Sequence, residues 1–160
     1  MRDDTVAPAQ AIHVSPGQMI VSSGSRVLHT VLGSCVSVCL WDPELKIGGM
    51  NHFMLPEAGS VYVASLRHGD FAMRALVSEM EALRCRRSRL SARVYGGASV
   101  LDGLASTLTL GARNVDFAIA WLEAERIPLD SAHVLGTSAR RVKFELESGV
   151  SGVRLLGVRT

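Results

Sequence analysis

One stretch of the chain predicts a β-hairpin that brings a cysteine and a histidine together. Residues 36–40 are rich in β-branched and apolar side chains, and residues 47–55 are typical of a returning strand. Between them, Asp42-Pro43-Glu44 has the residue types that favour the start of a type I turn. If this turn is centred between its proline and its glutamate, Cys35 lies directly opposite His52. Directly opposed residues of antiparallel strands face the same side, with Cβ atoms roughly 4.5–5.5 Å apart. The sequence therefore predicts that a thiol and an imidazole meet.

The residues around this cysteine suggest nucleophilic chemistry. A thiol needs a base to become a nucleophile at neutral pH, and histidine is the usual one. Gly33-Ser34 precede the cysteine and leave backbone N–H groups little obstructed, so they are candidates for holding an oxyanion. Gly96-Gly97, after a predicted strand, are candidates for a tight turn or a close approach to substrate. The alternatives are that Cys35 is a small hydrophobe of the core and that Gly33 only serves a turn.

The other chemically able residues carry weaker signals. Cys39 shares the face of Cys35 but has no glycine beside it, so it is not expected to react. Cys85 lies among arginines, which could lower its pKa, but no base is evident near it, so it is interpreted as an incidental thiol on the surface. Asn114 is expected to act as the N-cap of a helix. The arginines around Cys85 have no aromatic partners for stacking on bases, and the net charge is only +2, so no nucleic acid partner is expected. The three cysteines and five histidines lack metal-ligand spacing, so no metal site is expected.

The length of 160 residues suits one domain, and we expect a loose tail over residues 1–12 followed by the folded domain over 13–160. No apolar run reaches membrane-spanning length, and the first residues lack the pattern of a signal peptide, so a cytoplasmic protein without membrane insertion is expected. Strands and helices around one core indicate a layered α/β architecture. Beyond the hairpin, we expect helices over about 70–83 and 114–126, and strands over 18–22, 26–32, 90–95, 129–134, 142–146 and 153–158.

Six short motifs along the chain resemble, in their order, those of one known family. The two blocks around Cys35 and His52 are the specific ones, and the rest are supportive. The motifs are Leu32-Gly33-Ser34-Cys35-Val36, Trp41-Asp42-Pro43, Gly49-Met50-Asn51-His52-Phe53-Met54-Leu55-Pro56, Gly69-Asp70-x-Ala72-Met73, Tyr95-Gly96-Gly97-Ala98 and Gly111-Ala112-Arg113-Asn114. Over roughly residues 17–154 the chain resembles the CheD family of chemoreceptor glutamine deamidases.

The resemblance implies a three-layer α/β/α sandwich with mixed and antiparallel strands, distantly related to bacterial toxin deamidases. It places the catalytic cysteine and histidine on Cys35 and His52, and the third residue, which orients the imidazole, on Thr30. It implies a protein-glutamine glutaminase that converts glutamine side chains on the cytoplasmic helices of chemoreceptors to glutamate, with release of ammonia and without a cofactor. One departure is the run 135–140, which reads Leu-Gly-Thr-Ser-Ala-Arg where the family tends to have Gly-Gly-Asn-x-Gly-Arg.

Two other classes of function stay open. One is a thiol amidase or protease of different specificity, which would use the same cysteine on another bond. The other is a non-catalytic adaptor that binds chemoreceptors or a phosphatase and needs no reactive thiol. In some relatives a phosphatase of the CheC family binds and regulates the deamidase, so a CheC-type phosphatase is a candidate partner here.

Overall fold

The computed structural model describes residues 9–57, 64–100 and 109–157, and within them the chain forms two β-sheets and two α-helices. The elements in chain order are β1 Gln10–His13, β2 Met19–Ser23, β3 Arg26–Leu32, β4 Val36–Asp42, β5 Ile47–Asn51, α1 Gly69–Ala82, a 3₁₀ turn Arg87–Arg89, β6 Ser91–Gly96, α2 Leu110–Ala124, β7 Leu129–Val134, β8 Arg140–Glu145 and β9 Ser151–Leu155. The five-stranded sheet has the order β2-β5-β4-β6-β7, and the four-stranded sheet has the order β1-β3-β8-β9. Each sheet contains one parallel pair, β6 with β7 and β1 with β3, so both sheets are mixed.

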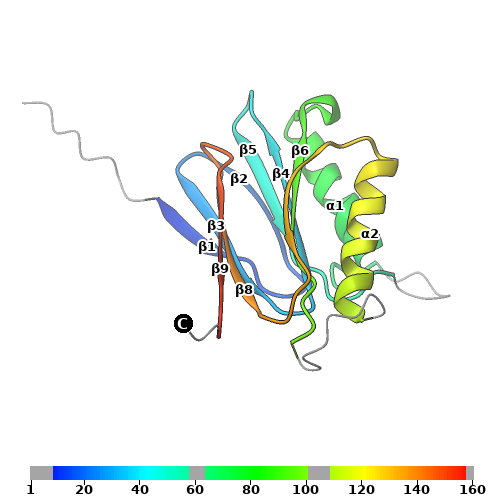
Figure 1. Cartoon of the computed structure of the whole chain (residues 1–160). Helices are drawn as coiled ribbons and strands as arrows, with labels where there is room; N and C mark the ends of the chain where they lie inside the picture. The colour runs from blue at the N-terminus through cyan, green and yellow to red at the C-terminus, as the bar shows by residue number, and fades with distance from the viewer. Residues whose placement is uncertain (1–8, 58–63, 101–108, 158–160) are drawn as a thin grey trace, which may run out of the picture.

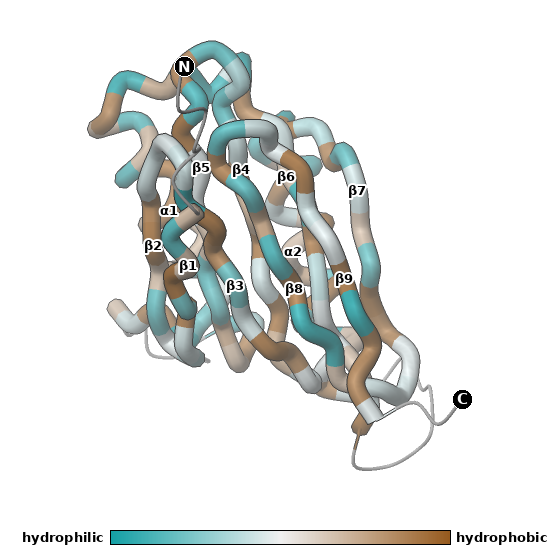
Figure 2. The backbone as a smooth tube through the Cα atoms, turned by 90° about the vertical axis from the view of Figure 1, so that its left-hand side faces the viewer, coloured by the Kyte–Doolittle hydropathy of each residue, from teal (hydrophilic) through white to brown (hydrophobic). Residues whose placement is uncertain are grey.

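Both helices cover one face of the five-stranded sheet, and the four-stranded sheet covers the other face (Figure 1). This confirms the predicted α/β class and the mixed strands. The expected α/β/α order is wrong for the described residues, because both helices lie on the same side. A second sheet takes the place of a helix layer because β8 alternates strictly: Val142 and Phe144 are buried, whereas Arg141 and Lys143 are exposed. Figure 2 looks onto this four-stranded sheet, with the helices behind it.

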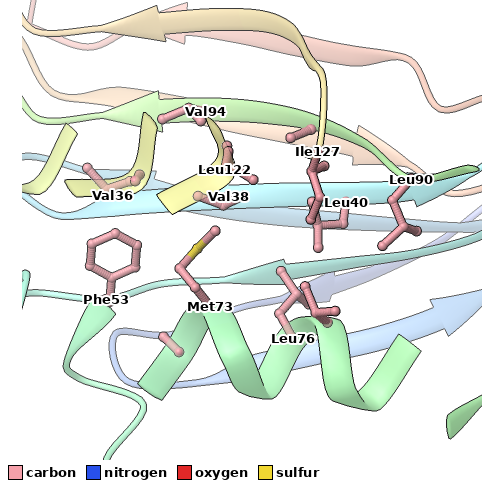
Figure 3. Packing of buried hydrophobic residues seen from close by; sticks show 14 of the residues in the cluster. Val36, Val38, Leu40, Phe53, Met73, Leu76, Leu90, Val94, Leu122 and Ile127 are labelled. Atoms are coloured by element: carbon pink, nitrogen blue, oxygen red, sulfur yellow. The ribbon is translucent and has the colours of Figure 1, made fainter. Parts of the chain in front are cut away.

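The apolar core between the two helices and the five-stranded sheet, called here the helix-side core, explains where both helices form. Ala72, Leu76 and Met80 recur at helical spacing on α1 and are fully buried against the five-stranded sheet. Figure 3 shows Leu76 and Met73 facing the apolar side chains of β4. α2 begins four residues before its predicted start, because Thr109 caps it by accepting a hydrogen bond from the N–H of Ala112 at 3.2 Å. The helices therefore form where the apolar periodicity predicted them, with one start misplaced.

The first described strand lies inside the segment expected to be a loose tail. β1 starts at Gln10 and pairs in parallel with β3, from Gln10 opposite Arg26 to His13 opposite His29. Most of its side chains are exposed, so its sequence shows no alternation of apolar and polar residues that would predict a strand. Main-chain hydrogen bonds to β3 order this segment instead. Residues 1–8, the rest of the expected tail, lie outside the described residues.

The β4–β5 hairpin is present, but its register differs by two residues from the predicted one. Asp42 pairs with Ile47, so the turn is centred one residue later than expected. The carboxylate of Asp42 accepts hydrogen bonds from the N–H groups of Glu44 and Leu45, at 3.0 and 3.2 Å. Lys46 then adopts a left-handed φ of 52°, which lengthens the turn. The prediction that Cys35 stands directly opposite His52 is therefore wrong.

A shift of two residues leaves every side chain on its predicted face, because side chains alternate along a strand. Cys35 and Cys39 both contact the core between the two sheets, where Met50 of β5 also lies. His52, two residues after Met50, reaches across this layer to Thr30 of the four-stranded sheet. The cysteine and the histidine thus share the inter-sheet layer, as expected, in a diagonal rather than a direct arrangement.

Candidate active site

Cys35 stands at the end of a short loop, one residue before β4. Its side chain is half-buried and contacts the inter-sheet core. Its carbonyl oxygen accepts a hydrogen bond from the N–H of Gly97 at 3.0 Å, and that of Gly33 accepts one from Ala98 at 2.9 Å. Within the described residues, no backbone carbonyl accepts from the N–H of Ser34 or Cys35. The loop is therefore held through its carbonyl groups, and neither N–H group is tied to another strand or loop of the described residues.

Gly96 and Gly97 hold this loop at a distance that no side chain permits. Both have positive φ angles, 109° and 73°. A Cβ atom at Gly96 would overlap the carbonyl oxygen of Cys35, and one at Gly97 would overlap Val115 and approach the carbonyl oxygen of Gly111 to 2.7 Å. The close approach predicted for these glycines is thus made to the protein's own backbone. Their contact with substrate stays a prediction.

His52 is 1% exposed and follows directly on β5. The ladder between β4 and β5 is irregular here, and the side-chain oxygen of Asn51 accepts the hydrogen bond from the N–H of Val38 at 2.9 Å. The backbone of His52 bonds to the segment before β2: its N–H donates to Gln18 at 3.2 Å, and its carbonyl accepts from Gly17 at 2.8 Å. The histidine is therefore fixed by its own backbone as well as by its ring.

Thr30 determines which ring nitrogen of His52 carries the proton. Its hydroxyl lies 2.6 Å from the carbonyl oxygen of Val14 and 2.8 Å from Nδ1 of His52, and all these groups are buried. A carbonyl can only accept, so the single hydroxyl proton goes to Val14. Nδ1 of His52 must then donate to Thr30, which leaves Nε2 unprotonated in the neutral ring. This arrangement makes Nε2 of His52 a base.

Burial favours the neutral form of both candidate residues. It lowers the pKa of His52; a hydrogen bond to the carbonyl of Val14 opposes this change, and the nearby His13 adds to it. Burial also raises the pKa of the Cys35 thiol, against the effect of a hydrogen bond from its own backbone N–H. These shifts favour a thiol and a neutral imidazole over a thiolate and an imidazolium.

A cavity of about 370 Å³ adjoins the loop that carries Cys35. Its wall is mostly apolar and is formed by residues 33–34, 98–100 and 109–111 together with Ala139. Arg140, next to Ala139, is 1% exposed, and its guanidinium donates to the ring and the carbonyl oxygen of His133 at 2.7 and 2.5 Å. Arg140 also donates to the carbonyl oxygen of Leu135, which ties down the start of the segment 135–139, where Gly136 is the one glycine of the family's run that is present.

Asn114 has a role that the sequence did not reveal. It lies inside α2, so its prediction as an N-cap is wrong. Its Nδ2 donates to the carbonyl oxygens of Ser34 and Met54, both at 3.0 Å. These two residues flank Cys35 and His52, so Asn114 joins both halves of the candidate site. The signals in the sequence were a polar residue near the apolar face of a helix and its place in the motif Gly111-Ala112-Arg113-Asn114.

The remaining predicted candidates lie apart from this site. Cys39 is fully buried in the inter-sheet core, and burial raises its pKa far above the usual range. Cys85 is 4% exposed rather than on the surface, because it belongs to the helix-side core, and burial together with the nearby Asp42 carboxylate raises its pKa to about 11. In the neighbouring basic run, Arg87 and Arg89 pair with carboxylates of the protein. The described residues contain no cluster of side chains able to hold a metal ion and no helix long and apolar enough to cross a membrane.

Comparisons with known proteins agree on one family. The family model described as CheD chemotactic sensory transduction matches residues 54–154. A relative from Shewanella oneidensis, named probable chemoreceptor glutamine deamidase CheD 1, is 43% identical over 148 residues, which are 90% of this chain and 71% of the relative. Relatives of the same description from Albidiferax ferrireducens and Cupriavidus pinatubonensis are 44% and 41% identical over 84% and 92% of this chain, and 56% and 70% of their own lengths. These matches show that the chain belongs to the CheD family.

Proposed function

We propose that this protein is a chemoreceptor glutamine deamidase that hydrolyses specific glutamine side chains of methyl-accepting chemotaxis receptors to glutamate. The relatives carry this activity in their names. The observation that carries the proposal for this chain is the hydrogen bond from His52 Nδ1 to Thr30 Oγ1, which leaves Nε2 free to act as a base. Cys35 is the nucleophile, His52 the base and Thr30 the residue that orients the ring.

The strand register supports the pairing of Cys35 with His52. Val36 and Phe53 form a β-bridge, and Cys35 and His52 each precede one member of that bridge. In this antiparallel arrangement the two side chains are diagonal neighbours on one face, a relation in which Cα atoms are roughly 7–8 Å apart and Cβ atoms are closer. A cysteine and a histidine side chain can span this separation, so the thiol can reach Nε2.

The reaction follows from these positions. Nε2 of His52 takes the thiol proton as Cys35 Sγ bonds to the carboxamide carbon of the substrate glutamine. The tetrahedral oxyanion accepts hydrogen bonds from the N–H groups of Ser34 and Cys35, with Gly33 leaving the approach open. His52 then gives its proton to the departing amine, which leaves as ammonia, and a thioester remains. Water attacks the thioester with His52 again taking a proton, and the glutamate carboxylate and the free thiol are restored.

The substrate we propose is a glutamine on a receptor's cytoplasmic helix rather than free glutamine. The mostly apolar cavity beside Ser34 offers room for the aliphatic part of a side chain and its neighbours. None of the described side chains that line this cavity is charged, so among residues 9–57, 64–100 and 109–157 no clamp for the α-amino and α-carboxylate groups of a free amino acid is evident. Binding energy from a polypeptide outside the reacting group would position the carboxamide. A CheC-type phosphatase remains a candidate partner of this protein.

Mass spectrometry of a receptor fragment tests the proposal. Incubation with the wild-type protein is expected to release ammonia and add about one mass unit per deamidated glutamine, because the amide becomes a carboxylate. Cys35→Ala and His52→Ala are each expected to lose this activity and remain folded. Cys39→Ala, which removes another thiol from the same face of β4, is the matched control and is expected to stay active.

The other outcomes separate the alternatives. Substantial ammonia release by Cys35→Ala contradicts covalent catalysis. Equal kcat/KM on free glutamine indicates a small-molecule amidase, and cleavage of peptide bonds indicates a protease. Full activity of Cys35→Ala in chemotaxis indicates an adaptor that binds receptors without modifying them.

A further inference from the structure

Asn114 connects the two segments that carry the candidate catalytic residues. It is fully buried in α2, and its Nδ2 donates to Ser34 and Met54 at 3.0 Å each. Ser34 directly precedes Cys35, and Met54 follows His52 by two residues. The Val36–Phe53 bridge joins the two segments through backbone hydrogen bonds, and the Asn114 amide adds a second connection just beyond it, at Ser34 and Met54.

The two polar atoms of the Asn114 amide differ in their hydrogen bonding. Its Oδ1 is buried and has no hydrogen-bond partner among the described residues. An unsatisfied buried polar atom destabilises a fold, so an apolar residue would fill this position better if space-filling were the only requirement. The two bonds donated by Nδ2 are what Asn114 supplies and what an apolar side chain would lack.

The start of α2 is packed closely enough to the loop of Cys35 to make these bonds effective. A Cβ atom at Gly111, one turn before Asn114, would lie 2.5 Å from the carbonyl oxygen of Gly97 and 2.7 Å from that of Ala98. Gly97 and Ala98 in turn donate to the carbonyl oxygens of the Cys35 loop. The helix thus contacts that loop through the 97–98 segment and, independently, through the Asn114 amide.

We propose that Asn114 is a positioning residue, which keeps the Cys35 loop and the His52 segment at the separation that proton transfer between them requires. The proposal rests on the deamidase function proposed above. Asn114 acts on catalysis through Cys35 and His52, because its amide contacts backbone carbonyls rather than the reacting atoms. The deamidase should therefore lose turnover without Asn114, while substrate binding stays nearly unchanged.

The test compares Asn114→Ala with Leu122→Ala. Leu122 is 1% exposed on the same helix but belongs to the helix-side core, so its truncation weakens α2 without touching Ser34 or Met54. Each variant is measured by urea unfolding, by kcat and KM on a receptor fragment, and by the rate at which iodoacetamide alkylates Cys35 across a range of pH, mapped by peptide. Asn114→Ser, which is smaller but keeps a hydroxyl donor, is measured in the same way in case Asn114→Ala does not fold.

For Asn114→Ala we expect kcat to fall about 100-fold with KM nearly constant, the size of loss that a misplacement of about 1 Å can cause. Alkylation of Cys35 should shift to higher pH, because moving the thiol away from the His52 ring separates it from the group that takes its proton. Leu122→Ala should keep the wild-type kcat and pH profile. A kcat and profile of Asn114→Ala that match those of Leu122→Ala would overturn the proposal. The same match in Asn114→Ser would also overturn it, because the single hydroxyl proton of serine can serve at most one of the two carbonyl oxygens that the proposal requires Asn114 to hold. If the wild-type protein deamidates no receptor fragment, the proposed function fails, and the alkylation profiles still decide the role of Asn114.

Discussion

Replacing Thr30 by valine removes one hydroxyl and keeps the shape of the side chain. The hydroxyl has two buried partners, the carbonyl oxygen of Val14 at 2.6 Å and Nδ1 of His52 at 2.8 Å. Each partner left unsatisfied in the interior costs about 1–3 kcal/mol. Thr30→Val is therefore expected to lower the free energy of unfolding by at least about 2 kcal/mol, which a domain of ordinary stability survives.

The effect on catalysis comes from the tautomer of His52. The bond to Thr30 contributes about 1 kcal/mol to the form with the proton on Nδ1. Without it, rings with the proton on Nε2 become populated, and these cannot accept a proton from Cys35. The lost preference and the looser ring together are expected to lower kcat by about 10- to 100-fold, since each 1.4 kcal/mol corresponds to tenfold in rate.

Thr30→Ser is the matched control, because it keeps the hydroxyl and loses only a methyl group. It should retain most of the activity, whereas Thr30→Val should not. Ammonia release from a receptor fragment gives kcat, and ¹⁵N NMR of the imidazole reports which nitrogen of His52 carries the proton. Wild-type turnover in Thr30→Val, with the His52 proton still on Nδ1, would refute the role assigned to Thr30.

Three further results are expected. Gly97→Ala should cost more stability and activity than Gly24→Ala in urea unfolding and turnover assays, because both residues have φ near 75° but only Gly97 has neighbours that a Cβ would strike; equal losses would contradict this. Limited alkylation with peptide mapping should label Cys35 before the buried Cys39 and Cys85, and preferential labelling of Cys85 would count against Cys35 as the reactive thiol. Because the pKa of His52 is lowered in the fold, its contribution to stability is complete above the unfolded value of about 6.5 and is lost as pH falls through the lowered value. Unfolding measured against pH should therefore be less acid-sensitive in His52→Gln than in the wild-type protein, and identical slopes would contradict this.

The hairpin shows how far the sequence alone could predict the site. Strand periodicity correctly assigned β4 and β5, and the side-chain alternation correctly placed Cys35 and His52 on one face. The register failed because it depended on turn length, and that length depends on the left-handed conformation of Lys46. Lysine gives no warning of such a conformation, which glycine or asparagine usually signals.

The contacts made across layers were beyond what periodicity can predict. Thr30 was placed by family resemblance, and the structure shows its hydrogen bond to His52, which joins the two sheets. Asn114 was misassigned, because a polar residue near a helix start resembles an N-cap until its tertiary partners are known. The layer order was wrong because it was taken from the family resemblance. The alternation of a strand shows that one of its faces is buried, but it does not show whether a helix or a sheet covers that face.

The three layers of the fold each position a different part of the candidate site. The four-stranded sheet supplies Thr30, the five-stranded sheet carries Cys35 and leads into His52, and α2 supplies Asn114. The relative positions of thiol, base and orienting group therefore depend on how the layers pack, rather than on any single loop. Burial favours the neutral forms of the Cys35 thiol and the His52 imidazole, so in the proposed mechanism thiolate formation depends on the position of the base. A substitution that shifts one layer by a fraction of an ångström should thus reduce turnover before it measurably destabilises the protein.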